Sequence, residues 1–290
     1  EGGGGGGGGR LLVLNSAANS EESDADLETM GGRLAEDVRR FVLNQCPELF
    51  SQANQEAKLS FIAHSAGGLI VRAALARPEM RMVHPKLHAF VTLSTPHLGN
   101  AVGTSGLVGA GMRALDLFSP KLGKPPGLLK QLLLQDAPRH KAGEAFLCRL
   151  ASAPGPGAFR HVVLVAAEGD EYVPRASALA QRSPELIGAG GAAAAAGGAA
   201  AGTTPPPRRL GPHEAAYLQM MEDFLGQIQP ERLIRVNLHA APPEKNMDTF
   251  IGRAAHIAYL DCPRIAALLL FTFLDLLLQE EEEQPPQQQR

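Results

Sequence analysis

The chain has 290 residues, of which 44% are hydrophobic and 20% are charged, as is ordinary for a globular protein. This length is enough for one sizeable α/β domain or two small ones. The net charge of −3 comes from 27 basic and 30 acidic residues without a basic stripe, which argues against nucleic acid as a partner.

Three low-complexity segments divide the sequence. They are a glycine run (1–9), an alanine/glycine tract ending in prolines (188–207) and a tail rich in glutamate and glutamine (279–290). None of them can bury a core, so we expect flexible tails and a flexible insertion within one domain spanning 10–278. Because the chain opens with Glu1 and not with methionine, we expect an N-terminally truncated piece of a longer protein that has lost any targeting signal.

Strand and helix signals alternate along the domain. A short apolar run predicts a strand at Arg10–Leu14, and apolar residues at steps of three and four predict a helix at Ser23–Cys46, with Ser23 and Asp26 as a capping box. The strands that follow are predicted at Leu59–Ala63, His88–Ser94, His161–Ala166 and Leu233–Leu238, and the helices at Gly67–Ala76, Pro212–Ile228 and Pro263–Leu278. Apolar strands that alternate with helices predict an α/β fold with a mainly parallel sheet and helices on both faces.

Cysteine spacing and apolar runs limit the other classes of protein. Cys46, Cys148 and Cys262 lie far apart and are odd in number, which predicts no metal site or disulfide framework and favours reduced thiols in the cytoplasm. No nucleotide or other cofactor motif is present. The apolar stretch Ile265–Leu278 is shorter than the roughly 18 residues of a membrane span, so we expect a buried helix there, with an interfacial helix and transient membrane-surface contact as the alternative.

The most informative segment surrounds Ser65. It reads as a strand, a run of small residues and a helix, with Ala63 and Gly67 two positions to either side of the serine. Such a strand–turn–helix is typical of the nucleophile elbow of α/β-hydrolases, in which the backbone N–H of the next residue, here Ala66, stabilises an oxyanion. The alternative is a tight turn that carries an idle serine.

These motifs resemble a known family. The segments Ala63–Gly68 (AHSAGG) and Phe90–Gly99 (FVTLSTPHLG) are similar to the serine esterase branch of the lipase-like hydrolases, and closest to the lipase-like domain of the eukaryotic "family with sequence similarity" proteins. Further similarity lies in Val162–Pro174 and Phe250–Asp261. The resemblance implies an α/β-hydrolase fold and hydrolysis of a carboxylic ester, often of a lipid. Family domains begin with a strand ending in His-Gly that supplies an oxyanion donor, and no such motif precedes Arg10.

A nucleophilic serine needs a histidine base and a carboxylate, and in this fold they follow it in the order acid, then base. Asp170 lies just beyond the strand at His161–Ala166, and the resemblance assigns it the D-x-x-V-P pattern of the family. Glu168 and Glu171 are close rivals for the acid.

Three histidines follow Asp170, namely His213, His239 and His256. His213 lacks a preceding strand, whereas His239 directly ends the strand Leu233–Leu238. The family motif places the base at His256, with His239 as the alternative.

Two other histidines and one segment lie near these motifs. His64 should point away from the Ser65 hydroxyl, and His97 is expected to shape the pocket wall. Apolar residues interrupted by glycine and proline at 103–135 suit a mobile cover that binds acyl chains, or an ordinary core helix.

The sequence therefore predicts a serine esterase or lipase that acts through Ser65, Asp170 and His256 on an ester or lipid substrate. The alternative is a weak or inactive hydrolase-like domain that serves as an interaction module. Acyl transfer to an alcohol would use the same three residues.

Overall fold

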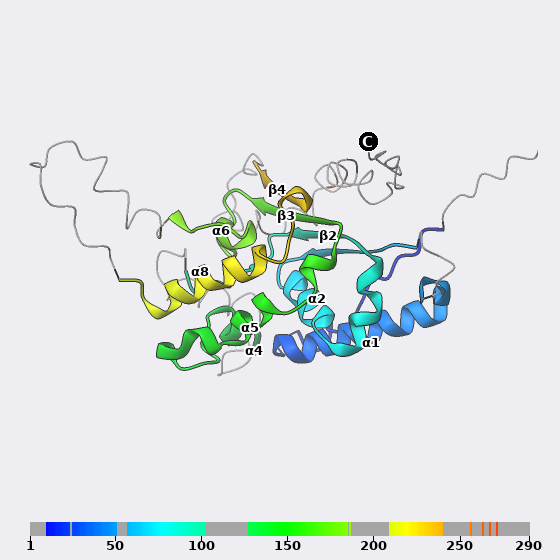
Figure 1. Ribbon diagram of the computed structural model, residues 1–290, viewed down its shortest axis with the longest axis horizontal. Helices are drawn as coiled ribbons and strands as arrows, with labels where there is room; N and C mark the ends of the chain where they lie inside the picture. Colours follow the sequence, from blue (N-terminus) through cyan, green and yellow to red (C-terminus); the bar gives the residue numbers. More distant parts are fainter. Residues whose placement is uncertain are drawn as a thin grey trace, which may run out of the picture.

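The computed structural model describes residues 10–23, 25–50, 57–102, 127–184, 186 and 209–239, together with His256, Pro263, Ala267 and Phe271. Its centre is a parallel sheet of four strands in the order β1-β2-β3-β4 (Figure 1). The strands are β1 (Leu59–His64), β2 (Leu87–Leu93), β3 (His161–Ala167) and β4 (Leu233–Leu238). The sequence had placed all four to within one residue, and the parallel α/β class is confirmed.

The two inner strands explain why their signal was so clear. Every residue of β2 is buried, as is every residue of β3 after His161. A strand covered on both faces reads as a continuous apolar run, and both strands do. Phe90 of β2 pairs with Phe61 of β1 and Val162 of β3, which places one aromatic and aliphatic row across the sheet.

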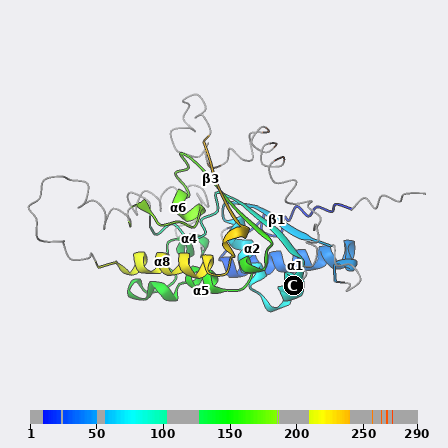
Figure 2. The same cartoon turned by 45° about the horizontal axis from the view of Figure 1, so that its top comes forward.

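The described helices form a layer against one face of this sheet. In Figures 1 and 2, α1, α2, α5 and α8 lie together on the same side of the strands. The α-helices are α1 (Leu27–Gln45), α2 (Gly67–Leu75), α4 (Gly127–Leu132), α5 (Phe146–Ser152), α6 (Arg175–Ala178) and α8 (Pro212–Leu225). Short 3-10 helices are η1 (Pro47–Phe50), η2 (Pro78–Lys86), η3 (Arg139–Glu144), η4 (Pro156–Ala158) and η5 (Pro230–Arg232).

Helices α1 and α2 approach closely because of a glycine. A Cβ atom on Gly31 would lie 2.7 Å from the Cβ of Ala73, closer than such atoms can pack. Gly31 lowers helix propensity by about 1 kcal/mol relative to alanine, and close packing against α2 explains its presence in α1. The capping box predicted from Ser23 is wrong, since Asp26 itself is the N-cap and accepts a hydrogen bond from the Thr29 N–H at 2.7 Å.

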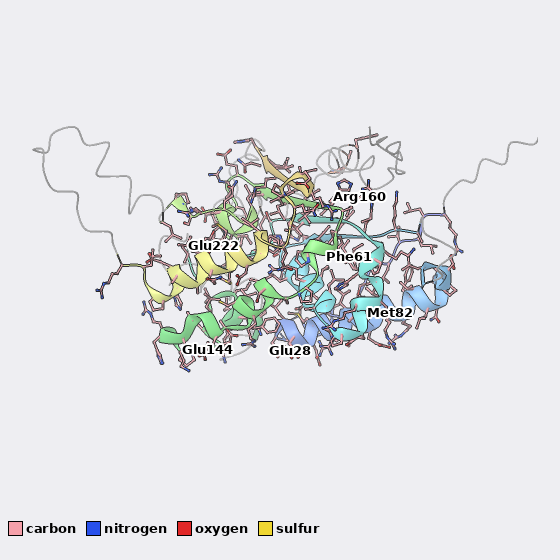
Figure 3. All side chains as sticks on the ribbon, viewed as in Figure 1. Glu28, Phe61, Met82, Glu144, Arg160 and Glu222 are labelled. Atoms are coloured by element: carbon pink, nitrogen blue, oxygen red, sulfur yellow. The ribbon has the colours of Figure 1, made fainter. Side chains whose placement is uncertain are left out.

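Side chains fill the space between the sheet and this helical layer (Figure 3). One core cluster joins α1, α2, α4, α5 and α8 to Phe90, Val162 and Leu164 of the inner strands. A smaller cluster lies on the opposite face and consists of residues of β2 and β3, with partly buried residues of β4 packed against it. The described residues do not test the expectation of helices on that second face. Most of the predicted helix Pro263–Leu278 lies outside the described residues, and within it Pro263, Ala267 and Phe271 are helical.

Of two other expectations, one is wrong and one falls outside the described residues. Arg10–Leu14 is not a strand: Leu11 and Val13 are each 76% exposed, and the segment pairs with no strand among the described residues. An apolar run becomes a strand only where a neighbouring strand completes its hydrogen bonds. The low-complexity segments 1–9, 188–207 and 279–290 lie outside the described residues.

The apolar segment 103–135 divides into two parts. Residues 103–126 lie outside the described residues. The remainder begins with α4, whose Leu128 and Leu132 are buried in the main core with Leu134 just beyond. This second part is therefore ordinary core packing and not a mobile cover.

Candidate active site

Ser65 occupies a strained turn between β1 and α2. Its φ angle is +53°, a conformation that is uncommon for a residue other than glycine. The turn is fixed by its neighbours, because the Ser65 N–H donates to the Leu93 carbonyl at 2.9 Å and the Thr95 hydroxyl donates to the Ser65 carbonyl at 2.8 Å. Leu93 is the last residue of β2 and Thr95 lies two residues beyond it, so the end of the neighbouring strand holds the serine in place.

Position 68, near the start of α2, requires a glycine. A Cβ atom on Gly68 would lie 2.4 Å from the Thr95 Oγ1 atom. The same threonine holds the Ser65 carbonyl, so any side chain at position 68 would displace the contact that fixes the serine. The absence of a side chain at position 68 thus has a steric cause.

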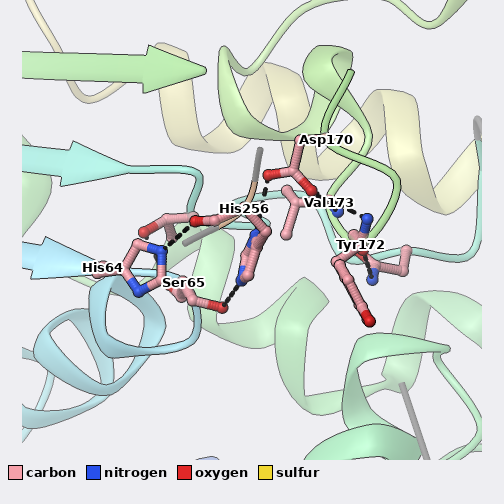
Figure 4. Close-up of polar contacts among 8 residues, drawn as sticks. His64, Ser65, Asp170, Tyr172, Val173 and His256 are labelled. Carbon is pink, nitrogen blue, oxygen red and sulfur yellow. Dashed lines mark hydrogen bonds and ion pairs between the residues drawn. The ribbon is translucent and has the colours of Figure 1, made fainter. Parts of the chain in front are cut away.

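The structure brings Ser65, His256 and Asp170 together at the carboxyl ends of the strands (Figure 4). The Nε2 atom of His256 lies 2.9 Å from the Ser65 Oγ atom, and its Nδ1 atom lies 2.9 Å from the Asp170 Oδ2 atom. The side chains of His256 and Asp170 are each 2% exposed. A carboxylate can only accept, so His256 carries its proton on Nδ1, which leaves the Nε2 lone pair to accept from the serine hydroxyl.

The loop after β3 holds the carboxylate of Asp170 in one orientation. Its second oxygen accepts hydrogen bonds from the backbone N–H groups of Tyr172 at 2.9 Å and Val173 at 3.0 Å. The loop turns at Gly169, whose φ is +79°, and the Asn100 side chain donates to the Tyr172 carbonyl at 2.9 Å. Both carboxylate oxygens are therefore occupied, and one of them faces the His256 ring.

The N-terminus of α2 faces the space beside Ser65. The N–H groups of Gly68, Leu69 and Ile70 already donate to the carbonyls of Ser65 and Ala66. Within the described part of the chain, the N–H of Ala66 has no acceptor. Because unpaired N–H groups at a helix N-terminus favour negative charge, Ala66 stays a predicted oxyanion donor.

The rival residues lie apart from this cluster. His239 pairs with the carboxylate of Glu168, and their side chains are 68% and 60% exposed. Glu171 is also exposed, and His213 lies in the first turn of α8. Within the described part of the chain, no contact joins Ser65 to these alternative acids (Glu168 and Glu171) or alternative bases (His213 and His239).

His97 is not a pocket-wall residue, and that expectation is wrong. The ring is fully buried in the core on the helical face, stacked on Phe224 with 5.0 Å between centroids. Its Nε2 atom lies 3.0 Å from the Thr92 Oγ1 atom, and the Arg72 guanidinium lies 3.4 Å from Nδ1. Burial together with the Arg72 charge holds the pKa of His97 well below its usual value, so the ring stays neutral.

Arg72 is the buried cation that organises this region. Its guanidinium donates to the carbonyls of His97 at 2.9 Å and Leu150 at 3.3 Å and lies 4.5 Å from the centre of the Phe224 ring. Burial lowers the pKa of Arg72 to about 9. These contacts tie α2 to the loop after β2, to α5 and to α8, so Arg72 supports the loop that carries Thr95.

Sequence reasoning missed two aromatic neighbours of His256. The His64 Nε2 atom lies 2.8 Å from the His256 backbone carbonyl, and the two ring centroids are 4.9 Å apart. The Tyr172 ring lies 5.4 Å from the His256 ring on centroids. His64 does keep clear of the Ser65 hydroxyl in Figure 4, but no sequence pattern indicated what it would contact instead.

The parallel sheet, the strained serine elbow and the carboxyl-end cluster define a protein of the α/β-hydrolase type. A family model described as "Putative serine esterase (DUF676)" matches residues 7–183, and the chain belongs to this family. The matched range includes Ser65 and Asp170, whereas His256 lies beyond it. No solved structure matches the chain. None of the helices in the described ranges is long and apolar enough to cross a membrane.

Proposed function

We propose that this protein is a carboxylic ester hydrolase in which Ser65 is the nucleophile, His256 the general base and Asp170 the acid that orients the base. The observation that carries the proposal is the continuous hydrogen-bonded chain from the Ser65 hydroxyl through the His256 ring to the Asp170 carboxylate, with both contacts at 2.9 Å. Membership of a serine esterase family supports the same reaction class.

The first half of the reaction forms an acyl-enzyme. The Ser65 Oγ atom attacks the ester carbonyl carbon while His256 Nε2 takes the hydroxyl proton. The negative charge that develops on the carbonyl oxygen is stabilised by the Ala66 N–H at the start of α2, and Asp170 stabilises the imidazolium. The imidazolium then gives its proton to the leaving alcohol, and the carbon–oxygen bond to that alcohol breaks.

The second half releases the acid. Water attacks the acyl carbon, His256 accepts a proton from the water, and the bond to Ser65 Oγ breaks as the proton returns to the serine. The hydrogen bonds to both Asp170 oxygens keep the carboxylate beside His256 through both halves. An alcohol in place of water would give acyl transfer by the same residues.

For the substrate we propose acyl esters of lipid type. The support is the sequence of residues 103–126, where Leu107, Val108, Met112, Leu115, Leu117 and Phe118 are interrupted by glycines, a composition suited to an apolar cover over acyl chains. Hydrolysis of nitrophenyl esters from acetate to long acyl chains tests this. A steady preference for acetate that survives deletion of Leu107–Phe118 would leave a small-ester esterase.

The reaction class is tested by the same esters with two matched variants. Ser65→Ala should abolish hydrolysis, while Ser152→Ala, an exposed serine of α5, should leave it unchanged. Equal hydrolysis by wild type and Ser65→Ala would refute the proposed nucleophile.

A further inference from the structure

His64 connects the nucleophile elbow to the backbone of the proposed base. It is the last residue of β1 and directly precedes Ser65. Its Nε2 atom lies 2.8 Å from the His256 carbonyl oxygen, and a carbonyl can only accept, so the His64 ring donates this hydrogen bond through an Nε2–H. The residue before Ser65 therefore holds the main chain of the residue that faces Ser65.

The contact with His64 differs in kind from the other contacts of His256. Asp170, Ser65 and Tyr172 all touch the imidazole ring. Among the described residues, only His64 hydrogen-bonds to the backbone of His256. A contact with the main chain of His256 also bears on where its ring lies, and an error of about 1 Å in a reacting group can cost roughly a hundredfold in rate.

We propose that His64 is a positioning residue that fixes the backbone of His256, so that the imidazole stays within reach of both Ser65 and the leaving group during proton transfer. The inference rests on the proposed function and deepens it, since it assigns a second histidine to the same site. His64 does not touch the reacting atoms. It acts through His256.

The environment of His64 suits a neutral donor. Burial lowers the pKa of His64. A charged ring at that position would face the His256 imidazolium at a centroid separation of 4.9 Å and oppose the proton transfer from Ser65. The neutral ring with its proton on Nε2 provides the hydrogen bond without that repulsion.

Two substitutions separate the hydrogen bond from the bulk of the ring. His64→Gln keeps an N–H donor at about the same reach, whereas His64→Met fills similar space without a donor. We expect His64→Met to lower kcat by about tenfold to a hundredfold with little change in KM, because a misplacement of about 1 Å in a reacting group can cost roughly a hundredfold. We expect His64→Gln to keep a kcat close to that of wild type, because the donor is retained.

The measurement is kcat and KM for nitrophenyl ester hydrolysis by the 290-residue chain, with the Tm of each variant. Wild-type kcat in His64→Met would overturn the inference. Equal losses in both variants at unchanged Tm would overturn it too, because they would assign the effect to the ring and not to its hydrogen bond. If wild type and Ser65→Ala hydrolyse equally, the proposed function itself fails.

A readout that does not depend on activity distinguishes failure of the His64 inference from failure of the proposed function. The downfield proton NMR signal of the His256 Nδ1–H, shared with Asp170, should persist in His64→Gln and broaden by faster exchange in His64→Met. An identical signal in wild type and both variants would show that His64 does not position the ring, whatever the chain hydrolyses.

Discussion

The Ser65 hydroxyl and the His256 ring meet at 2.9 Å although the two residues lie 191 positions apart in the chain. The sheet accounts for this meeting, because parallel strands end at the same edge and the loops beyond them converge there. Ser65 follows β1, and Asp170 follows β3. The geometry of the cluster thus depends on the topology of the sheet more than on any single loop.

Replacing Asp170 by asparagine should remove the orientation of the proposed base, His256, and leave the fold intact. The amide can no longer favour a proton on His256 Nδ1, and in the serine protease triad the same change lowers kcat by about ten-thousandfold. We expect a loss of at least a hundredfold in ester hydrolysis. The control is Glu168→Gln, which removes the carboxylate that pairs with His239 and should leave the rate near that of wild type. A larger effect of Glu168→Gln than of Asp170→Asn would reverse the assignment of the acid.

Substituting Gly68 by alanine should destabilise the elbow. The new Cβ would lie 2.4 Å from Thr95 Oγ1 and 2.6 Å from its Cγ2 atom, so the threonine must move off the Ser65 carbonyl. Such overpacking typically lowers the free energy of unfolding by about 1–3 kcal/mol. Chemical denaturation measures it. The control is Gly143→Ala, where the added atom meets nothing within 4 Å, and comparable losses in the two variants would contradict the steric account.

Acid should destabilise the fold through His97. Burial keeps its folded pKa well below the ordinary value, so the unfolded chain takes up a proton below about pH 6.5 and the folded chain does not. The contribution of His97 is therefore complete above about pH 6.5 and falls with decreasing pH, by up to about 1.4 kcal/mol per pH unit.

This prediction is checked by measuring the free energy of unfolding between about pH 7.5 and 5 and comparing its slope against pH among variants. His97→Gln should flatten the slope, while His140→Gln, at an exposed position, should not. The partly buried His64 and His161 also have lowered pKa values, chiefly because of desolvation, so some slope should remain. An unchanged slope in His97→Gln would show that the ring is protonated in the folded state.

The sequence predicts best what depends on neighbours along the chain. The apolar runs of β2 and β3 and the glycine at position 68 are local patterns with direct physical causes. The strands are buried on both faces, and Thr95 crowds Gly68. Order along the chain and the family resemblance then placed Asp170 and His256, which the structure brings to Ser65.

The features that the sequence could not predict depend on contacts between residues that lie far apart in the chain. Arg10–Leu14 has the composition of a strand and yet lies exposed, because a strand also needs a paired neighbour. His97 was expected at the pocket and lies in the core, since its contacts with Arg72 and Phe224 come from α2 and α8. The bond from His64 to the His256 carbonyl likewise exists only in the folded chain.

The most direct test of the central claim is covalent labelling with a fluorophosphonate, followed by mass mapping of the modified peptide. Because the proposal has His256 activate the Ser65 hydroxyl, which lies 2.9 Å away, the account predicts one adduct on Ser65, lost in Ser65→Ala and strongly slowed in His256→Ala, with both variants folded as judged by Tm. Labelling of another serine, or equal labelling of wild type and Ser65→Ala, would contradict the account.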